Sequence, residues 1–162
     1  MQVSGFDFSK TAITVATTRA QQQQVADQCN FFVHDALRPW PLGDGMFDLV
    51  MNIFGISEIE SAAGRRFAVR EAVRVLQPGG WLLTYTHSSA DQFCRELRRT
   101  RPARQPKSYV YPTGMVGTFF SQQEVRWLYA PLRLVTAVQV RRHDTFLGKT
   151  YSVVHHWMLF QK

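Results

Sequence analysis

Residues 70–85 read REAVRVLQPGGWLLTY and determine the class of fold. Apolar residues at helical spacing, with arginines on another stripe, predict a helix over Ala63–Leu76. Pro78 ends this helix, and the two glycines that follow are expected to form a left-handed turn, which residues with a Cβ resist. The apolar residues Trp81–Thr86 then predict a strand. A helix that leads through a tight turn into an apolar strand is typical of α/β folds.

Strand and helix patterns also alternate before this stretch. Strands are predicted at Gln2–Phe6 and Phe31–Val33, with a helix between them that Asp7 or Ser9 caps. The apolar run Phe47–Ile53 predicts a strand that is buried on both faces. This alternation indicates a largely parallel sheet with crossover helices.

The second half of the chain has less regular patterns. A helix is expected over Ala90–Arg99, and Ser121 begins another, with Glu124 placed to complete a capping box. Between them, Pro102–Thr118 carries several prolines and glycines and is predicted to be irregular. The last two predicted strands, whose short connection suits an antiparallel pair, are Leu132–Arg141 and Tyr151–Phe160.

The 162 residues are 45% hydrophobic and 13% aromatic, which suits a globular domain with a core. No apolar run is long enough for a transmembrane helix, and no signal-peptide pattern is present, so we expect a single cytoplasmic domain over residues 1–162. Cys29 and Cys94 fit neither a disulfide framework nor a zinc site. The histidines near the C-terminus also lack metal-ligand spacing, and we predict no metal site.

The formal net charge of +7 has an uneven source. Six basic side chains lie within thirteen positions, where Glu96 is the single acid. They are Arg95, Arg98, Arg99, Arg101, Arg104 and Lys107. The favoured interpretation is a solvated helix end followed by a loop. Binding of a small anion is an alternative, and so is contact with RNA, because Tyr109 and Tyr111 follow closely.

The order and spacing of several segments resemble one family. These segments are VSGFDFS at 3–9, FFVHDALRPWPLGDGMFDLV at 31–50, REAVRVLQPGGWLLTY at 70–85, FFSQQEV at 119–125 and WMLFQK at 157–162. Together they resemble a class I S-adenosylmethionine-dependent methyltransferase of the small-molecule type. The resemblance implies a Rossmann-like sheet, mostly parallel with an antiparallel last strand, and methyl transfer from S-adenosylmethionine to a small-molecule acceptor that the sequence does not identify.

The resemblance also implies residues that bind the nucleoside part of S-adenosylmethionine. Asp7 matches the acid that accepts hydrogen bonds from the ribose hydroxyls, and Phe8 matches the residue that packs on adenine. Asp35 and Ala36 match the pair that binds the adenine amino group and a ring nitrogen. A helix cap at Asp7, core packing at Phe8 and a turn cap at Asp35 are the alternatives.

Further residues are expected near the methyl group. Asn52 and Ile53, at the end of a predicted strand, match the border of the methionine part, and a strand-end cap is the alternative for Asn52. Glu58, Tyr85 and His87 are weak candidates for catalysis, with ordinary polar loop roles as the alternative. Residues 101–120 occupy the place where the family varies for substrate recognition.

The resemblance departs from the family at the N-terminus, because no segment matches the first strand and its glycine-rich turn. We therefore expect an N-terminally truncated sheet and weak or absent binding of S-adenosylmethionine by this chain alone. The strands Gln2–Phe6 and Phe47–Ile53 would then have unpaired edges, which favours a homodimer. A non-catalytic interaction module on the same scaffold is the alternative to an incomplete or impaired methyltransferase domain.

Overall fold

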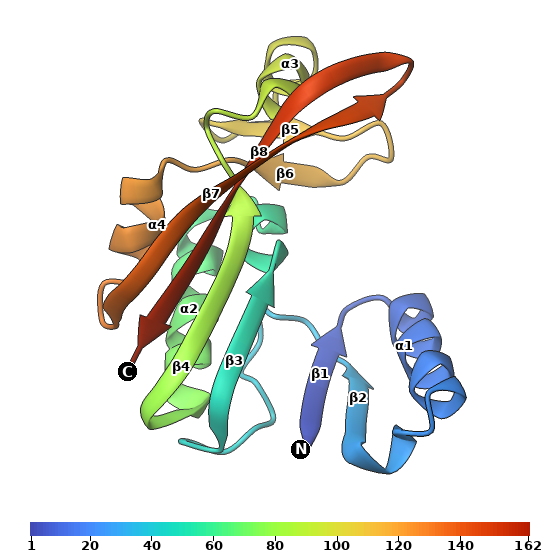
Figure 1. Cartoon of the computed structure of the whole chain (residues 1–162), viewed down its shortest axis with the longest axis vertical. Helices are drawn as coiled ribbons and strands as arrows, with labels where there is room; N and C mark the ends of the chain where they lie inside the picture. Colours follow the sequence, from blue (N-terminus) through green and yellow to red (C-terminus); the bar gives the residue numbers. More distant parts are fainter. The chain divides into compact units, whose positions relative to one another are not determined.

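The computed structural model describes residues 1–162, which form two compact units, Met1–Pro41 and Leu42–Lys162. The elements of the first unit are β1 (Val3–Asp7), α1 (Lys10–Gln22), the 3-10 helix η1 (Ala26–Gln28) and β2 (Cys29–Val33). Strands β1 and β2 pair in parallel, and α1 contacts both (Figure 1). The prediction of a single domain over the whole chain stays a prediction.

The second unit contains a four-stranded sheet in the order β3-β4-β8-β7 (Figure 1). Its elements are β3 (Phe47–Ile53), the 3-10 helix η2 (Gly55–Glu58), α2 (Ala62–Val75), β4 (Leu76–His87), α3 (Gln92–Thr100), β5 (Ser108–Val110), β6 (Val116–Thr118), α4 (Gln122–Leu128), β7 (Arg133–Phe146) and β8 (Lys149–Gln161). Strands β3 and β4 are parallel, whereas β8 is antiparallel to both β4 and β7. The predicted α/β class, with an antiparallel last strand, is confirmed.

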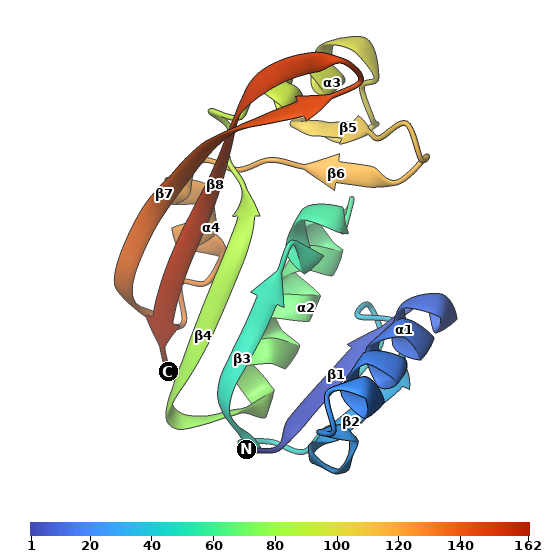
Figure 2. The same cartoon turned by 45° about the vertical axis from the view of Figure 1, so that its right-hand side comes forward.

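Helix α2 provides much of the core of the second unit. Its buried side chains follow the predicted apolar stripe and are Ala68, Val69, Ala72 and Val75. Helix α2 contacts β4 and α4, and Figure 2 shows it running alongside β3 and β4. Tyr129 and Phe160 extend this core, with their ring centroids 5.0 Å apart. Burial of each large apolar side chain contributes roughly 1.5–3 kcal/mol, so this layer is a main source of stability.

The helix starts follow the capping residues. The Ser9 hydroxyl accepts a hydrogen bond from the Ala12 amide at 3.2 Å, so Ser9 is the cap of α1. The capping box of Ser121 and Glu124 at α4 is confirmed. Helix α3 begins two residues later than expected, because the carboxylate of Asp91 accepts a hydrogen bond from the Cys94 amide at 2.7 Å and caps the helix.

The two glycines before the apolar part of β4 have different roles, which corrects the expectation for the second. Gly79 has a φ of 79° and adopts the left-handed conformation that was predicted. Gly80 does not have a positive φ. A Cβ on Gly80 would lie 2.8 Å from Leu76 Cδ2 and 2.9 Å from the Gln77 carbonyl oxygen, so glycine is required there for close packing.

The prediction that Phe47–Ile53 is buried on both faces is wrong. Leu49, Met51 and Ile53 are 47%, 58% and 50% exposed. The reason is topological, because β3 lies at the edge of its sheet and pairs only with β4. An apolar run therefore marks a strand here without marking a central one.

The segment Pro102–Thr118 is more regular than predicted, since β5 and β6 form an antiparallel hairpin within it. Tyr109 of β5 is completely buried and packs with Cys94, Leu97 and Phe119. A Cβ on Gly117, in the opposite strand, would lie 2.6 Å from the Tyr109 ring, so the ring lies directly over this glycine. Tertiary packing of one tyrosine thus orders a segment that is rich in turn residues.

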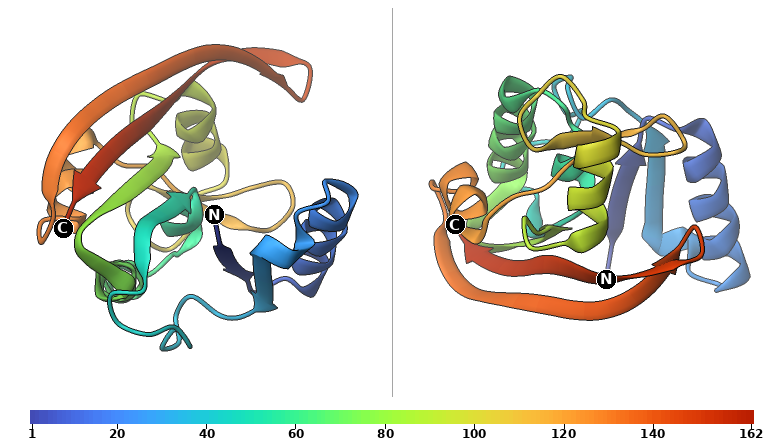
Figure 3. Two further views of the ribbon diagram at one scale, coloured as in Figure 1. Left: turned by 60° about the horizontal axis from the view of Figure 1, so that its bottom comes forward. Right: turned by 90° about the horizontal axis from the view of Figure 1, so that it is seen from above.

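A two-residue turn joins the last two strands, as the short connection predicted. Leu147 and Gly148 have φ values of 53° and 75°, which is typical of the type I′ turn of tight hairpins. The β7–β8 pairing continues past the end of β4, where β8 contacts α3 and Phe93 stacks on Phe146 at 4.3 Å between centroids. Figure 3 shows this hairpin as the long orange and red ribbon beside α3. None of the helices combines the length and apolar character that crossing a bilayer requires.

Candidate functional site

In the first unit, two predicted carboxylates lie at the carboxyl end of the parallel pair of strands. Asp7 is the last residue of β1 and lies opposite Val33, and Asp35 follows β2 by two residues. One oxygen of Asp7 accepts from the Ser9 amide at 2.7 Å, and one oxygen of Asp35 accepts from the Leu37 amide at 2.9 Å. Each carboxylate therefore supports its local turn and keeps its second oxygen for another donor.

The residue after Asp7 projects its ring away from the core. Phe8 is 72% exposed, so ordinary core packing does not account for it. Ala36 lies beside Asp35, and its carbonyl accepts from Trp40 Nε1 at 3.2 Å. This end of the first unit thus offers two carboxylate oxygens and an exposed aromatic face.

In the second unit, Asn52 closes the turn at the end of β3. Its side-chain oxygen accepts from the Ile56 amide at 3.2 Å, which is the strand-end cap that the sequence left open as an alternative. The amide nitrogen of Asn52 remains as a donor. Ile53 is half exposed beside it. These two predicted cofactor residues belong to the second unit, whereas the other four belong to the first.

An aromatic–imidazole cluster lies beyond the carboxyl ends of β3 and β4 and consists of Phe54, Tyr85, His87, Tyr111 and His155. The Phe54 ring lies 4.7 Å from the ring of His87 and 5.1 Å from that of His155, between centroids. The Tyr85 hydroxyl hydrogen-bonds His155 Nδ1 at 2.8 Å. The Tyr111 hydroxyl hydrogen-bonds His87 Nε2 at 2.9 Å. The structure therefore brings together Tyr85 and His87, two of the three predicted catalytic candidates.

Burial favours the neutral forms of His87, His155 and Tyr111 in the aromatic–imidazole cluster. Burial, helped by the nearby His155, lowers the pKa of His87 to about 4. Burial also lowers the pKa of His155 and raises the pKa of Tyr111 to about 12. At neutral pH the cluster thus offers neutral imidazoles, which can accept a proton or bind a cation, and tyrosine hydroxyls, which can donate hydrogen bonds.

The third catalytic candidate lies at the margin of the cluster. Glu58 is the exposed last residue of η2, and its charge adds a small upward contribution to the pKa of Tyr111. Sequence reasoning missed Phe54, Tyr111 and His155 as members of the cluster. The pairing of β4 with β8 places His87 directly opposite His155, and only this strand register reveals the partnership.

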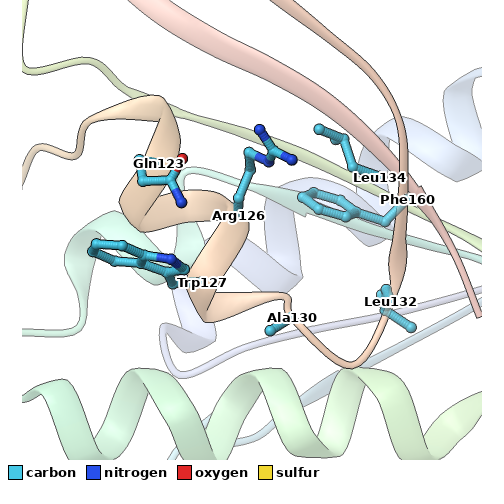
Figure 4. Close-up of a pocket in the computed structure, with 7 residues that line it drawn as sticks. All are labelled: Gln123, Arg126, Trp127, Ala130, Leu132, Leu134 and Phe160. Atoms are coloured by element: carbon cyan, nitrogen blue, oxygen red, sulfur yellow. The ribbon is translucent and has the colours of Figure 1, made fainter.

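The surface hollows of the second unit lie elsewhere. One, drawn in Figure 4, is lined by Gln123, Arg126, Trp127, Ala130, Leu132, Leu134 and Phe160. A larger one is lined by Arg66, Val69, Arg70, Val73, Arg74, Leu128, Pro131 and Lys162. Neither contains a residue that the sequence predicted for a site. Because α/β folds bind ligands beyond the carboxyl ends of their parallel strands, we place the candidate site residues of each unit at the carboxyl ends of its own parallel strands.

The basic side chains between positions 95 and 107 are partly neutralised by neighbouring acids. Arg99 pairs with Glu96 at 2.9 Å, and Lys107 pairs with Glu124 at 2.7 Å. Arg98 and Arg99 lie in the last turn of α3, where a positive charge interacts favourably with the helix dipole. These contacts favour the solvated helix end, while contact with RNA or a small anion stays an untested alternative.

Comparison with known proteins places the chain in a family. A family model described as a methyltransferase domain matches residues 1–84. A demethylmenaquinone methyltransferase of Lactiplantibacillus plantarum is 36% identical over 91 residues, which are 56% of this chain and 37% of that protein. The chain spans about a third of the length of the curated relatives it matches.

Solved structures share the fold. A SAM-dependent methyltransferase from Methanosarcina mazei superimposes with a TM-score of 0.83 at 19% identity, covering 99% of this chain and 82% of that one. The N-methyltransferase NodS from Bradyrhizobium japonicum, in complex with S-adenosyl-L-homocysteine, gives a TM-score of 0.65 at 18% identity, covering 99% of this chain and 66% of that one. With the family match, these likenesses show that this chain belongs to the methyltransferase domain family and has the class I S-adenosylmethionine-dependent methyltransferase fold.

Proposed function

We propose that this chain forms part of an S-adenosylmethionine-dependent methyltransferase that acts on an aromatic or polar small molecule. The observation that carries the proposal is the family match over residues 1–84, in which Asp7 and Asp35 lie at one end of the parallel pair β1–β2. The aromatic–imidazole cluster supports an aromatic acceptor. The name of the Lactiplantibacillus plantarum relative, a demethylmenaquinone methyltransferase, agrees with that class.

The first unit carries groups that suit the nucleoside of the cofactor. We assign the second oxygen of Asp7 to the ribose hydroxyls and that of Asp35 to the adenine amino group, since a carboxylate accepts several hydrogen bonds. The exposed ring of Phe8 suits stacking on adenine, and the Ala36 amide is assigned to a ring nitrogen.

We assign the second unit to the end of the cofactor that carries the methionine part and the methyl group. When bound, S-adenosylmethionine supplies an electrophilic methyl group on a sulfonium. Asn52 and Ile53 are assigned to the border of the methionine part. The chain's main tasks are to orient the acceptor and to exclude water. We keep Glu58, Tyr85 and His87 as residues of the acceptor side.

Residues 101–120 are also assigned to the acceptor side, because Tyr111 in this segment hydrogen-bonds His87. We retain a single functional domain over residues 1–162. A cytoplasmic location is proposed because Cys29 and Cys94 are both free thiols.

Isothermal titration of the 162-residue chain with S-adenosylmethionine and S-adenosylhomocysteine tests the cofactor assignment. We expect weak, roughly millimolar binding, because Asn52 and Ile53 are the only residues assigned to the methionine part of the cofactor. Asp7→Ala is expected to weaken binding by at least tenfold, since each lost hydrogen bond contributes about 1 kcal/mol.

Asp27→Ala is the matched control, because Asp27 is an acid in η1, before the amino end of β2. Its affinity should equal that of the unmodified chain. Equal affinities for Asp7→Ala and the unmodified chain would contradict the assignment of Asp7. A complete lack of heat with both ligands would favour the non-catalytic module.

The open edges of β1 and β3 favour a homodimer, which is compatible with either function. Strand β1 pairs only with β2, and β3 pairs only with β4. Unpaired apolar edges promote association between chains, and most homo-oligomers are two-fold dimers. Sedimentation equilibrium at micromolar concentration should give twice the 18.7 kDa chain mass. A monomer mass that does not change with concentration would exclude this dimer.

A further inference from the structure

Three side chains with metal-binding atoms converge near the carboxyl end of β4 in the second unit. His87 lies at the end of β4, Asp91 caps α3, and His155 lies in β8. One ligand atom from each lies within 4.8 Å of the other two. The strand register explains the convergence, because His87 and His155 are opposite each other on antiparallel strands. We refer to these three residues as the ligand triad.

Both imidazoles of the ligand triad are oriented by tyrosine hydroxyls. Tyr111 hydrogen-bonds His87 Nε2, and Tyr85 hydrogen-bonds His155 Nδ1. The other nitrogen of His87, Nδ1, is buried and has no hydrogen-bond partner. The hydrogen bond of His155 to Tyr85 is made by Nδ1, so Nε2 is the nitrogen left for a metal ion. In metal sites, ligating histidines use their second nitrogen in this way, and that contact fixes the ring for the metal.

Asp91 is a buried carboxylate without a cationic partner. It is 1% exposed, and it forms no ion pair with a lysine or arginine. Its oxygens accept from the Cys94 amide at 2.7 Å and the Val154 amide at 2.8 Å, which holds the carboxylate in place. Each oxygen keeps a further lone pair. A buried carboxylate is normally paired with a cation or bound to a metal, so this one lacks its expected partner.

We propose that His87, Asp91 and His155 bind a divalent transition-metal ion such as Zn²⁺. Two imidazoles and one carboxylate suit Zn²⁺, Fe²⁺ or Mn²⁺, whereas Mg²⁺ and Ca²⁺ prefer sites made of oxygen atoms alone. Ligand atoms around a zinc ion lie about 3–4 Å apart. A small rotation of the side chains therefore closes the triad around an ion.

The sequence prediction of no metal site considered only the two cysteines and the histidines near the C-terminus. The triad combines His87 and Asp91, four residues apart, with a histidine from a distant strand. The Phe54 ring stacks on His87 and makes an edge-to-face contact with His155, so the ion would border the proposed acceptor side. Three protein ligands leave further coordination positions for water or another oxygen or nitrogen ligand. Metal binding is independent of the proposed function.

Direct binding tests the proposal with the full chain. Chelator-treated protein is titrated with Zn²⁺ by calorimetry and with Co²⁺ by visible absorption. We expect one ion per chain, cobalt bands of a site with nitrogen and oxygen ligands, and a higher thermal unfolding midpoint with Zn²⁺. Mg²⁺ should give none of these signals. The absence of saturable Zn²⁺ and Co²⁺ binding would overturn the proposal.

Variants locate the ion. His87→Ala and His155→Ala should each weaken Zn²⁺ binding by more than about tenfold, and Tyr85→Phe should weaken it by a smaller factor. His143→Ala is the matched control, because His143 is an exposed histidine of β7 outside the triad. Its affinity should not change. Equal binding by all variants would place the ion elsewhere and refute the triad.

Asp91→Asn tests the carboxylate but also replaces one of the two oxygens that accept hydrogen bonds from the Cys94 and Val154 amides. Circular dichroism is therefore recorded for every variant, and the two histidine variants decide the outcome if Asp91→Asn does not fold. Titration with S-adenosylhomocysteine is run in parallel on the same samples. Loss of metal binding with retained nucleoside binding, or the reverse, separates a failure of this inference from a failure of the proposed function.

Discussion

The backbone of Phe54 adopts a left-handed conformation, with a φ of 60°, where β3 ends and η2 begins. Its amide donates a hydrogen bond to the Tyr85 carbonyl at 2.8 Å. Left-handed geometry costs a residue with a Cβ about 1–2 kcal/mol, and the ring contacts with the aromatic–imidazole cluster offset that cost. Strain of this kind gathers at functional sites, which agrees with the location of the candidate site.

Substitution of Phe54 by glycine or alanine separates backbone strain from ring packing. Both variants should be less stable than the unmodified chain, by about 2 kcal/mol or more, because the ring is lost. Phe54→Gly should nevertheless be about 1 kcal/mol more stable than Phe54→Ala, because glycine adopts a positive φ without strain. The free energy of unfolding in urea measures both differences.

In a helix, glycine and alanine should have the opposite order of stability. Ala68 is buried within α2, and Ala68→Gly should lower the free energy of unfolding by about 1 kcal/mol. If Phe54→Ala were as stable as Phe54→Gly, the left-handed conformation of Phe54 would be contradicted.

At the scale of elements, the β7–β8 hairpin has a turn whose sequence does not match its geometry. A type I′ turn needs a positive φ at both central positions, and Asn-Gly is the preferred pair. Leu147 occupies the first of these positions and is 83% exposed, so its side chain contributes little packing.

Leu147→Asn should therefore stabilise the second unit by about 0.5–1 kcal/mol, because asparagine tolerates the left-handed conformation. Leu147→Val should have the opposite effect, since a β-branched residue resists a positive φ. Thermal unfolding followed by circular dichroism measures both. A lower unfolding midpoint for Leu147→Asn would show that the turn is not of type I′.

The start of α4 should confer a pH-dependent part of stability. Partial burial opposes ionisation of Glu124, but hydrogen bonds from Lys107 and Ser121 outweigh it and lower the pKa below its ordinary value of 4.5. The folded state therefore holds the charged form more strongly than the unfolded state does. Its contribution, about 1 kcal/mol after allowance for solvent screening, is present above the unfolded pKa and lost as pH falls through the folded pKa.

Glu124→Gln tests this dependence, because glutamine keeps the shape of the capping box without the charge. The variant should be less stable than the unmodified chain at pH 7, and the difference should vanish in acid. Urea unfolding at a series of pH values measures it. A difference that stays constant with pH would assign the effect to packing alone.

For the whole molecule, the sequence predicted the elements whose signals are local. Periodicity located α2, and an apolar run located β3, although not its position at a sheet edge. The capping residues Ser9 and Ser121 marked helix starts because each bonds within its own turn. The β5–β6 hairpin was not predictable, since buried Tyr109 orders it through contacts with residues of α3.

The candidate site was predictable only in part, because local sequence signals do not reveal contacts between distant segments. Asp7 and Asp35 follow strands, so their location needed no tertiary knowledge. Tyr85 and His87 were found because they end β4. Their partner His155 is separated from Tyr85 by 70 positions, and only the register of two antiparallel strands brings it there.

The sheet order also determines when the second unit can finish folding. Strand β8 lies inside the sheet, between β4 and β7, yet it follows the other three strands of this sheet in chain order. On the ribosome, β3, α2 and β4 emerge and can collapse locally, but β4 must wait with one edge open until β8 is released. Pairings over long sequence separations form slowly, so we expect a late rate-limiting step and a period in which the nascent chain is open to chaperone binding.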